Sequence, residues 1–491
     1  MDKRPQYERH RPEQTSLYAV VRDNIETLYG AIDEGALDVR LPKHARKELD
    51  AYLDCGLLCR GFARLRCDTC EESRLVAFSC KGRGFCPSCV GRRMCATAAH
   101  LIEEVLPAVG LRQWVLTFPF PWRKRLAHDG ALLGRLTRIF VESANAAYTK
   151  RAEDKGAEGG KTGSVTVIQR TSSDMRLNPH LHVVFLDGVY REHEGDLTWN
   201  GQGHLQTREV ADVLVHAVKR MKRHLERGGL LELGDDTTPD DETDADRQGA
   251  LLASAVSGQA PPAGPQWLRG LRVPTPRALA FDKPLCASLD GFTLHAATKA
   301  GGLDVAGREA LLRYVLRPPL AQDRVELLDD GLVRIALKRA YADGTVAVDM
   351  DPLSLLCRLA ASVPPPRHHV VRYSGVLASA SPWRRIIAPK RPEAEEETSP
   401  ETKDGEPKAK RSGSYWPWAD LLRRTFDVDV LDCPKCHGRM KLLAMVTEAE
   451  SITRFLKGFG EPLDVPARAP NRGPPFWAST VLRQKSLGTA A

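Results

Sequence analysis

The stretch NPHLHVVFL, residues 178–186, decides how this chain is interpreted. Its second half is apolar and rich in β-branched residues, which predicts a strand, and the following Asp-Gly pair predicts a turn. Alternate side chains of a strand face the same side of a sheet. His180 and His182 are therefore expected to point together, with Leu181 on the opposite, buried face. Two imidazoles at this spacing can bind one divalent ion and leave positions open for water and a phosphate.

Two histidines alone also fit an ordinary solvated sheet face, so a firm metal site requires a third ligand. Gln169 ends the preceding predicted strand, SVTVIQ at 164–169, and is the first choice. His295, on the predicted strand GFTLHA at 291–296, is the second choice. Either side chain, taken alone, fits a structural hydrogen-bonding role better than a ligand role.

The surrounding sequence predicts an α+β protein. A further strand is predicted at 113–118 (QWVLTF), and a hairpin at 332–338 and 345–348 turns across an Asp-Gly pair. Apolar residues at helical spacing predict helices near the N-terminus at 18–28 and 44–58, and further along at 97–106, 126–152, 210–226 and 308–316. The helix at 126–152 carries a basic, arginine-containing face.

A short helix places Tyr314 between two arginines, Arg313 and Arg317, before Pro318-Pro319. A phenol can act as a covalent nucleophile when its proton is removed and the target is polarised. The arginines could hold a phosphate diester, and a nearby cation could offset its developing charge. A tyrosine in this setting, taken alone, fits a packed residue that caps a core better than a nucleophile.

Cysteines are concentrated in one short region. Eight of the twelve lie between Cys55 and Cys95. Two CxxC pairs, Cys67/Cys70 and Cys86/Cys89, are separated by fifteen residues, a spacing typical of a four-thiolate zinc site. The basic residues Arg92 and Arg93 lie beside them, which fits contact with nucleic acid as well as an ordinary solvated rim. The roles of Cys55, Cys59, Cys80 and Cys95 stay open, and so does metal binding by Cys433 and Cys436.

Composition and charge narrow the classes of function. The formal net charge of +8 favours a polyanionic partner, and two acidic stretches make the remainder more basic still. No apolar run approaches the length that a helix needs to span a bilayer. The N-terminus is polar and lacks the apolar core of a secretory signal, so we expect a cytoplasmic protein.

Changes in composition divide the 491 residues into six segments. We expect a helical N-terminal region (1–54), a zinc-binding, DNA-contacting module (55–100), an α+β core that carries His180, His182 and Tyr314 (110–322), an extension of that core (323–388), a charged linker (389–414) and a small C-terminal unit (415–491). Within the core, an acidic and proline-rich insertion at 235–265 is predicted to be disordered.

Taken together, these motifs resemble the IS91-type rolling-circle transposases of bacterial insertion sequences, a branch of the HUH endonuclease superfamily. The matching segments occur in one order: CDTC…FSCKGRGFCPSCVGRRM, RQWVLTFPFPWR, VTVIQR…LNPHLHVVFLDGVY, GFTLHA…LLRYVLRPPL and, near the end, PWADLLRRTFDVDVLDCPKCHGRMKLLAM. The resemblance implies an antiparallel HUH-type sheet with helices on one face, an N-terminal zinc module and a C-terminal α/β unit.

The resemblance also implies a reaction. His180 and His182 correspond to the histidines that hold Mg²⁺ or Mn²⁺, and Tyr314 corresponds to the nucleophile that forms a 5′-phosphotyrosine and frees a 3′-hydroxyl. The DNA partner would be single-stranded element ends and target. Founding members carry two tyrosines one helical turn apart, whereas this chain has Ala310 and Pro318 at those positions. The chain is therefore similar to the single-tyrosine relatives.

Two other functions remain open at this stage. A rolling-circle replication initiator uses the same chemistry, although the zinc module and the Arg-Pro-Pro segment after Tyr314 favour a transposase. A zinc-dependent DNA-binding protein without catalysis would share the cysteines but would not need Tyr314. Oligomeric state and DNA sequence preference are not indicated.

Overall fold

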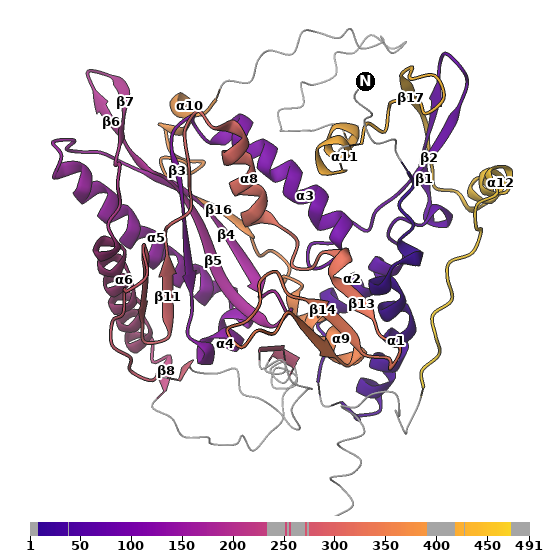
Figure 1. Cartoon of the computed structure of the whole chain (residues 1–491), viewed down its shortest axis with the longest axis horizontal. Coiled ribbons are helices and arrows are strands. Elements are labelled where there is room, and N and C mark those ends of the chain that lie inside the picture. Colours follow the sequence, from indigo (N-terminus) through magenta and orange to yellow (C-terminus); the bar gives the residue numbers. More distant parts are fainter. Residues whose placement is uncertain are drawn as a thin grey trace, which may run out of the picture.

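The computed structural model describes residues 8–37, 39–232, 251–252, 255–256, 271–272, 274–389, 418–426 and 428–472. It is a mixed α+β structure whose largest element is an antiparallel sheet (Figure 1). The predicted insertion at 235–265 and the linker at 389–414 lie almost entirely outside the described residues. None of the described helices has both the length and the hydropathy that crossing a membrane requires.

The large sheet places the histidine strand near its centre. Its strands follow the order β10 (Cys286–Leu289), β11 (Phe292–His295), β3 (Leu111–Thr117), β5 (Leu177–Leu186), β4 (Gly163–Thr171) and β16 (Val371–Gly375). The short β12 (Lys299–Ala300) also pairs with β3. Every pairing in this sheet is antiparallel. The strands predicted at 113–118, 164–169, 180–186 and 291–296 correspond to β3, β4, β5 and β11.

Helices cover both faces of this sheet. On one face, which we call the back, α5 (Gly130–Glu153) and α6 (Thr207–Arg227) pack on Leu181, Val183 and Phe185 of β5. On the other, the front, α3 (Pro87–His100) and α8 (Val305–Leu316) pack on apolar residues that include Val165 and Val184. Figure 1 shows α3 and α8 crossing the sheet on the side away from α5 and α6. The expectation of helices on one face is therefore wrong, because the front face has apolar positions of its own that must be buried.

The N-terminal helices share a core with a segment from much later in the chain. α1 (Ser16–Asp33) and α2 (Lys43–Leu53) pack with α9 (Pro352–Ser362) and with the hairpin sheet of β13 (Val325–Leu327), β14 (Val333–Ala336) and β15 (Ala347–Met350). The hairpin predicted at 332–338 and 345–348 is formed by β14 and β15. This second core includes Cys86 and Cys89 and is therefore continuous with the zinc module.

The C-terminal segment completes the sheet of the zinc module. β17 (Met440–Val446) pairs antiparallel with β1 (Phe62–Cys67), which pairs with β2 (Ser73–Ala77). α11 (Trp418–Phe426) contacts α3, and α12 (Ala449–Phe459) contacts η2 (Leu58–Arg60). Residues more than 350 positions apart are therefore neighbours in one small sheet.

The remaining elements are short or peripheral. They are η1 (Pro12–Gln14), η3 (Leu101–Val105), η4 (Phe120–Trp122), α4 (Arg123–His128), β6 (Gly188–His193), β7 (Asp196–Gly201), β8 (Leu231–Glu232), β9 (Leu271–Arg272), η5 (Gln322–Arg324) and α10 (Arg384–Ile387). The helix predicted at 126–152 is thus divided into α4 and α5, because Asp129 caps α5 by accepting a hydrogen bond from the Leu132 backbone N–H.

Candidate active site and cysteine clusters

His180 and His182 lie on the front face of the large sheet, on a strand flanked on both sides. His180 is in register with Thr117 of β3 and Gln169 of β4. The centroids of the two imidazole rings are 4.9 Å apart. His182 is 3% exposed, whereas His180 is partly exposed. The alternation of the strand therefore brings both rings to one place, as the sequence predicts.

The surroundings keep both imidazoles neutral. Burial lowers the pKa of His180 to about 4, with further lowering by the positive charges of Arg317 and Arg123. Burial lowers the pKa of His182 to about 2, aided by His180 and Arg317. The backbone carbonyl of Asn178 accepts a hydrogen bond from His180 Nδ1 over 2.7 Å. That bond leaves the Nε2 lone pair of His180 available, which is the form in which imidazole binds a metal.

Gln113 of β3 is a partner of His182 that sequence reasoning missed. Its amide nitrogen lies 2.5 Å from His182 Nδ1, and its Oε1 is buried without a hydrogen-bond partner among the described residues. The amide rotated by 180° would accept the Nδ1–H of His182 and so satisfy that oxygen. The available signal was a polar residue opening an otherwise apolar strand.

The remaining nitrogen of His182 marks the place that a cation would occupy. His182 Nε2 is buried and has no hydrogen-bond partner among the described residues. A buried polar atom without a partner is costly, and a metal ion would remove that cost. With Gln113 holding Nδ1, the nitrogen donors of His180 and His182 fit a divalent cation on the front face.

The two residues predicted as alternative third ligands lie at different distances from the pair. Gln169 stands directly opposite His180 on the adjacent strand. Its Nε2 donates a 2.6 Å hydrogen bond to the Val315 carbonyl of α8, so the amide oxygen is the atom of Gln169 that could bind a cation. His295 is exposed and pairs with Val115 of β3, so β3 separates it from β5. A separation of two strand spacings, about 10 Å, favours Gln169.

Tyr314 projects from α8 toward the imidazoles. The centroid of its ring is 6.1 Å from that of His182, and the side chain is 47% exposed. Leu311, Leu312 and Val315 of the same helix are buried against the sheet, which fixes the orientation of α8. The guanidinium carbon of Arg317 lies 4.1 Å from the centre of the Tyr314 ring. The half-exposed phenol of Tyr314, the two neutral imidazoles and the guanidinium of Arg317 therefore share one site.

The four arginines predicted to contact DNA are placed differently. Arg317 remains at the site, whereas Arg313 donates to the Arg424 carbonyl of α11 at 3.0 Å and pairs with Glu309 at 2.8 Å. Arg92 donates to Ser79 Oγ at 2.5 Å, and Arg93 donates to the Lys81 carbonyl at 3.3 Å. Protein partners thus hold the Arg313 guanidinium.

A cavity of about 610 Å³ opens beside the tyrosine helix. It lies between α3, the end of α8 and the strands β4 and β16, and Gln169 and Arg317 line it on the side of the histidine site. The zinc module contributes Arg83 and Arg93 to its wall, and β4 contributes Arg170. The cavity is therefore basic along its length.

The cysteines form two four-thiol clusters among the described residues. Members of each cluster lie within 4.8 Å of one another. The first, the α3 cluster, is Cys55, Cys80, Cys86 and Cys89, and the second, the hairpin cluster, is Cys67, Cys70, Cys433 and Cys436.

The prediction that Cys67, Cys70, Cys86 and Cys89 form a single site is therefore wrong in its pairing, although all four are potential ligands. Cys67 and Cys70 sit at the turn of the β1–β2 hairpin, whereas the chain leaves the other end of that hairpin to reach α3. Five residues of strand separate the two ends by about 17 Å. Cys59 and Cys95 belong to neither cluster.

Both clusters have the dimensions of a tetrahedral zinc site. Sulfur–sulfur distances are 3.6 Å for Cys55–Cys86 and 3.4 Å for Cys80–Cys89 in the α3 cluster. They are 3.5 Å for both Cys67–Cys436 and Cys70–Cys433 in the hairpin cluster. Four thiolates around Zn²⁺ at about 2.3 Å would lie about 3.8 Å apart. The backbone N–H groups of Cys70 and Thr69 help lower the pKa of Cys67 to about 6, which favours the thiolate that zinc requires.

Comparison with known protein families agrees with this geometry. Residues 29–118 match the model described as "Transposase zinc-binding domain" (Zn_Tnp_IS91), and residues 163–384 match that described as "Putative transposase" (Y2_Tnp). The chain therefore contains an IS91-type transposase zinc-binding domain, followed by a domain of the family described as "Putative transposase". Searches of curated proteins and of solved structures found no match.

The two matched ranges contain different groups of site residues. The transposase match includes Gln169, His180, His182 and Tyr314, and the zinc-binding match includes the α3 cluster and Gln113. Cys433 and Cys436 lie outside both matched ranges. The hairpin cluster therefore joins the family's zinc-binding domain to a C-terminal segment that neither model covers.

Proposed function

We propose that this transposase nicks and rejoins single DNA strands through a covalent bond between Tyr314 and a 5′-phosphate. The observation that carries the proposal is the position of the Tyr314 ring, 6.1 Å from the His182 ring and stacked by Arg317. A buried structural tyrosine would need neither a cation over its ring nor neutral histidines beside it.

In the proposed step, the Tyr314 oxygen attacks the phosphorus of a backbone phosphodiester. A tyrosine–phosphorus bond forms as the bond to the 3′-oxygen breaks. The phenol loses one proton and the departing 3′-oxygen gains one, so no proton is consumed overall. The phosphodiester between two nucleotides is exchanged for a phosphodiester between Tyr314 and the 5′-oxygen, so the energy of the bond is kept. A later 3′-hydroxyl can therefore reverse the step and rejoin the strand without ATP.

Each surrounding residue has a role that follows from its contacts. Arg317 places a positive charge over the ring of Tyr314, where it would hold the phosphate and offset its developing charge. Gln113 fixes the ring of His182, and Gln169 joins the histidine sheet to the tyrosine helix through Val315. A Mg²⁺ or Mn²⁺ ion held by His180, His182 and Gln169 would polarise the phosphate.

The basic cavity beside α8 offers a route for the strand. It begins at Gln169 and Arg317 and extends along α3, whose N-terminal end belongs to the α3 cluster. A single strand there would meet arginines from the sheet and from the zinc module. The two cysteine clusters have four protein ligands each, so zinc in them would be structural and leave no position for substrate.

The test is a nicking assay on single-stranded oligonucleotides that cover the DNA flanking the transposase gene. Full-length protein should cut one of them, EDTA should stop the reaction, and Mn²⁺ or Mg²⁺ should restore it. Tyr314→Phe should abolish nicking, whereas Tyr341→Phe, at another exposed tyrosine, should leave it unchanged.

The same assay separates the other candidate functions. Full activity of Tyr314→Phe would favour the zinc-dependent DNA-binding protein without catalysis. A replication initiator would cut at an origin rather than at an element end, and the match to the transposase zinc-binding domain favours the element end.

A further inference from the structure

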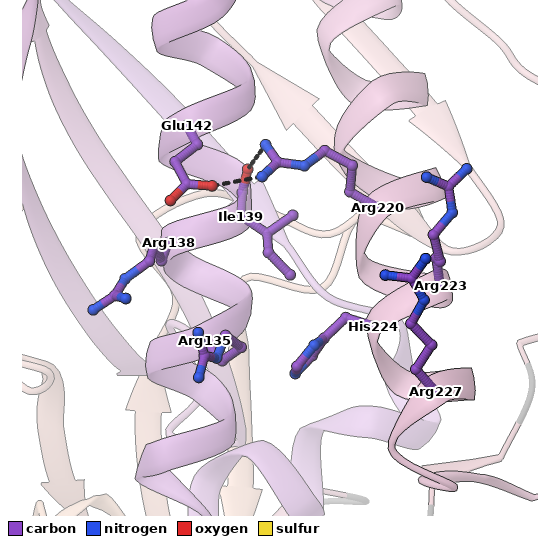
Figure 2. A pocket seen from close by; sticks show the side chains of 8 residues that line it. All are labelled: Arg135, Arg138, Ile139, Glu142, Arg220, Arg223, His224 and Arg227. Atoms are coloured by element: carbon purple, nitrogen blue, oxygen red, sulfur yellow. Dashed lines mark hydrogen bonds and ion pairs between the residues drawn. The ribbon is translucent and has the colours of Figure 1, made fainter.

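A second basic surface lies on the opposite side of the large sheet from Tyr314. It is a groove of about 330 Å³ between α5 and α6, which cover the back face (Figure 2). Its lining contains five arginines, one histidine and a single carboxylate, and comprises Arg135, Arg138, Ile139, Glu142, Arg220, Arg223, His224 and Arg227.

We propose that this back-face groove binds the phosphate backbone of duplex DNA. The proposal rests on the proposed function only in taking DNA as the polyanion. The groove is separate from the nicking site, because the buried residues of β5 and the helices α5 and α6 stand between them.

Helical spacing gathers the arginines along the groove. Arg135 and Arg138 are three residues apart on α5, and Arg220, Arg223 and Arg227 follow at intervals of three and four on α6. Residues at those intervals share one face of a helix. Figure 2 shows the α6 arginines ranged along one wall and the α5 arginines along the other. Phe140 and Met221, both fully buried, belong to the core that holds the two helices together.

Arg220 is held by contacts within the protein, whereas the other arginines of the groove are free to contact a ligand. Arg220 pairs with Glu142 at 2.5 Å and donates to Ser143 Oγ at 3.1 Å. Arg135, Arg138 and Arg223 are exposed and form no ion pair with any residue that the structure describes. Like charges this close repel one another, and a bound polyanion would relieve that repulsion.

The positive surface continues beyond the groove. Arg138 and Glu142 also line an adjoining cavity of about 450 Å³, together with Arg372 and Tyr373 of the edge strand β16. Burial lowers the pKa of Arg372, and the charge of Arg138 lowers it further. The groove and this cavity therefore form a basic track from α6 across α5 to β16. A track of that kind fits a run of phosphates better than one small anion.

The chemistry of the lining favours a duplex over a single strand. Ile139 is the one apolar residue in the groove lining, and the lining contains no Phe, Tyr or Trp, its single ring being the imidazole of His224. Sites for single strands combine basic residues with aromatic rings on which successive bases stack. A groove that offers five guanidiniums and one imidazole suits contact with phosphates, and guanidinium is the side chain best suited to that contact. The occupant would be duplex DNA next to the strand being cut.

The test compares binding of the full chain to a 30-base-pair hairpin duplex and to a single strand of the same length. The variant Arg138→Gln/Arg223→Gln/Arg227→Gln removes three exposed charges. Duplex affinity should fall at least about tenfold, and the slope of log K against log salt should decrease by about 2 to 3. The matched control is Arg208→Gln on the same helix, a residue 69% exposed and paired with Asp212, which should bind duplex normally.

The outcomes distinguish this proposal from the nicking proposal. The triple variant should still nick a short single-stranded oligonucleotide at the wild-type rate, since Tyr314 is on the other face. Unchanged duplex affinity, or an equal loss of single-strand affinity, would overturn the groove proposal. If the wild-type protein does not nick DNA but the triple variant still loses duplex affinity, the groove proposal stands and the proposal that Tyr314 nicks DNA is rejected. A triple Arg→Lys variant, which keeps the charge, should retain the salt slope and shows that any loss is electrostatic.

Discussion

The two cysteine clusters and the histidine pair contrast as candidate metal sites. Each cluster gathers four sulfur ligands within 4.8 Å, which closes a tetrahedron. The histidine pair offers two nitrogens on one strand, with an exposed phenol and an arginine beside them. A closed site can only hold the protein together, whereas an open one can also accept a phosphate. In the proposed function, the thiols hold structural zinc and the imidazoles take part in the reaction.

The clusters also differ from each other. The α3 cluster joins residues 34 positions apart or fewer, so it can form within the N-terminal module. The hairpin cluster joins Cys67 to Cys436 across 369 positions. It therefore fastens the C-terminal segment to the module, and α11 of that segment touches the tyrosine helix through Arg313 and Arg424. A structural metal could in this way support the active site from a distance.

The largest effect is expected from breaking the local cluster. Cys86→Ser should reduce zinc from two ions per chain to one and unfold the N-terminal module, because structural zinc contributes about 10–16 kcal/mol of folding free energy. Native mass spectrometry measures the zinc content, and far-UV circular dichroism with urea measures the folding. Cys59→Ser, outside both clusters, is the control. Two retained zinc ions in Cys86→Ser would contradict the assignment.

The open site should lose activity without losing its fold. His182→Ala should lower the nicking rate at least about a hundredfold while zinc stays at two ions per chain. His295→Ala, on β11, should have little effect because it lies beyond β3. Equal losses in the two variants would mean that the cation is held elsewhere.

The hairpin cluster should hold the C-terminal segment on the zinc module. Cys433→Ser should lower zinc to one ion and leave the α3 cluster folded. With a protease site placed in the predicted linker at 389–414, the wild-type C-terminal fragment should stay bound after cleavage and the variant fragment should separate on gel filtration. Co-elution of the Cys433→Ser fragment would show that β17 pairing alone suffices.

The smallest effect is expected from changing Gln113, whose amide contacts His182 Nδ1. Gln113→Leu removes the partner of Nδ1 and should weaken Mn²⁺ affinity about 10–100-fold, measured as the Mn²⁺ concentration that gives half-maximal nicking. Gln113→Glu keeps an acceptor and should retain most of that affinity. If Gln113→Leu behaves as wild type, the amide does not orient the ring.

The sequence predicted features that depend on local periodicity. The alternation in NPHLHVVFL placed His180 and His182 on one face and Leu181 in the back core, and the structure agrees. The turn and helix signals around Tyr314 likewise located α8. These features follow from strand and helix geometry within about ten residues.

Features that depend on tertiary pairing were not predictable in this way. The partners of Cys67 and Cys70 come from 363 to 369 positions later, and the spacing of CxxC pairs gives no information about which pairs meet. Gln113 reaches His182 only because β3 and β5 are neighbours in the sheet. The front face of the large sheet also carries apolar residues, and α3 and α8 cover them. The sequence pattern alone does not show which face of the sheet each apolar residue belongs to.

The account depends most directly on which atom becomes bonded to DNA. The measurement is peptide mapping by mass spectrometry of the covalent adduct formed between full-length protein and an end-derived single strand, after nuclease digestion. The account predicts a nucleotide attached through a 5′-phosphate to the Tyr314 peptide and no adduct with Tyr314→Phe. A nucleotide on any other residue, or cleavage without a covalent intermediate, would contradict it.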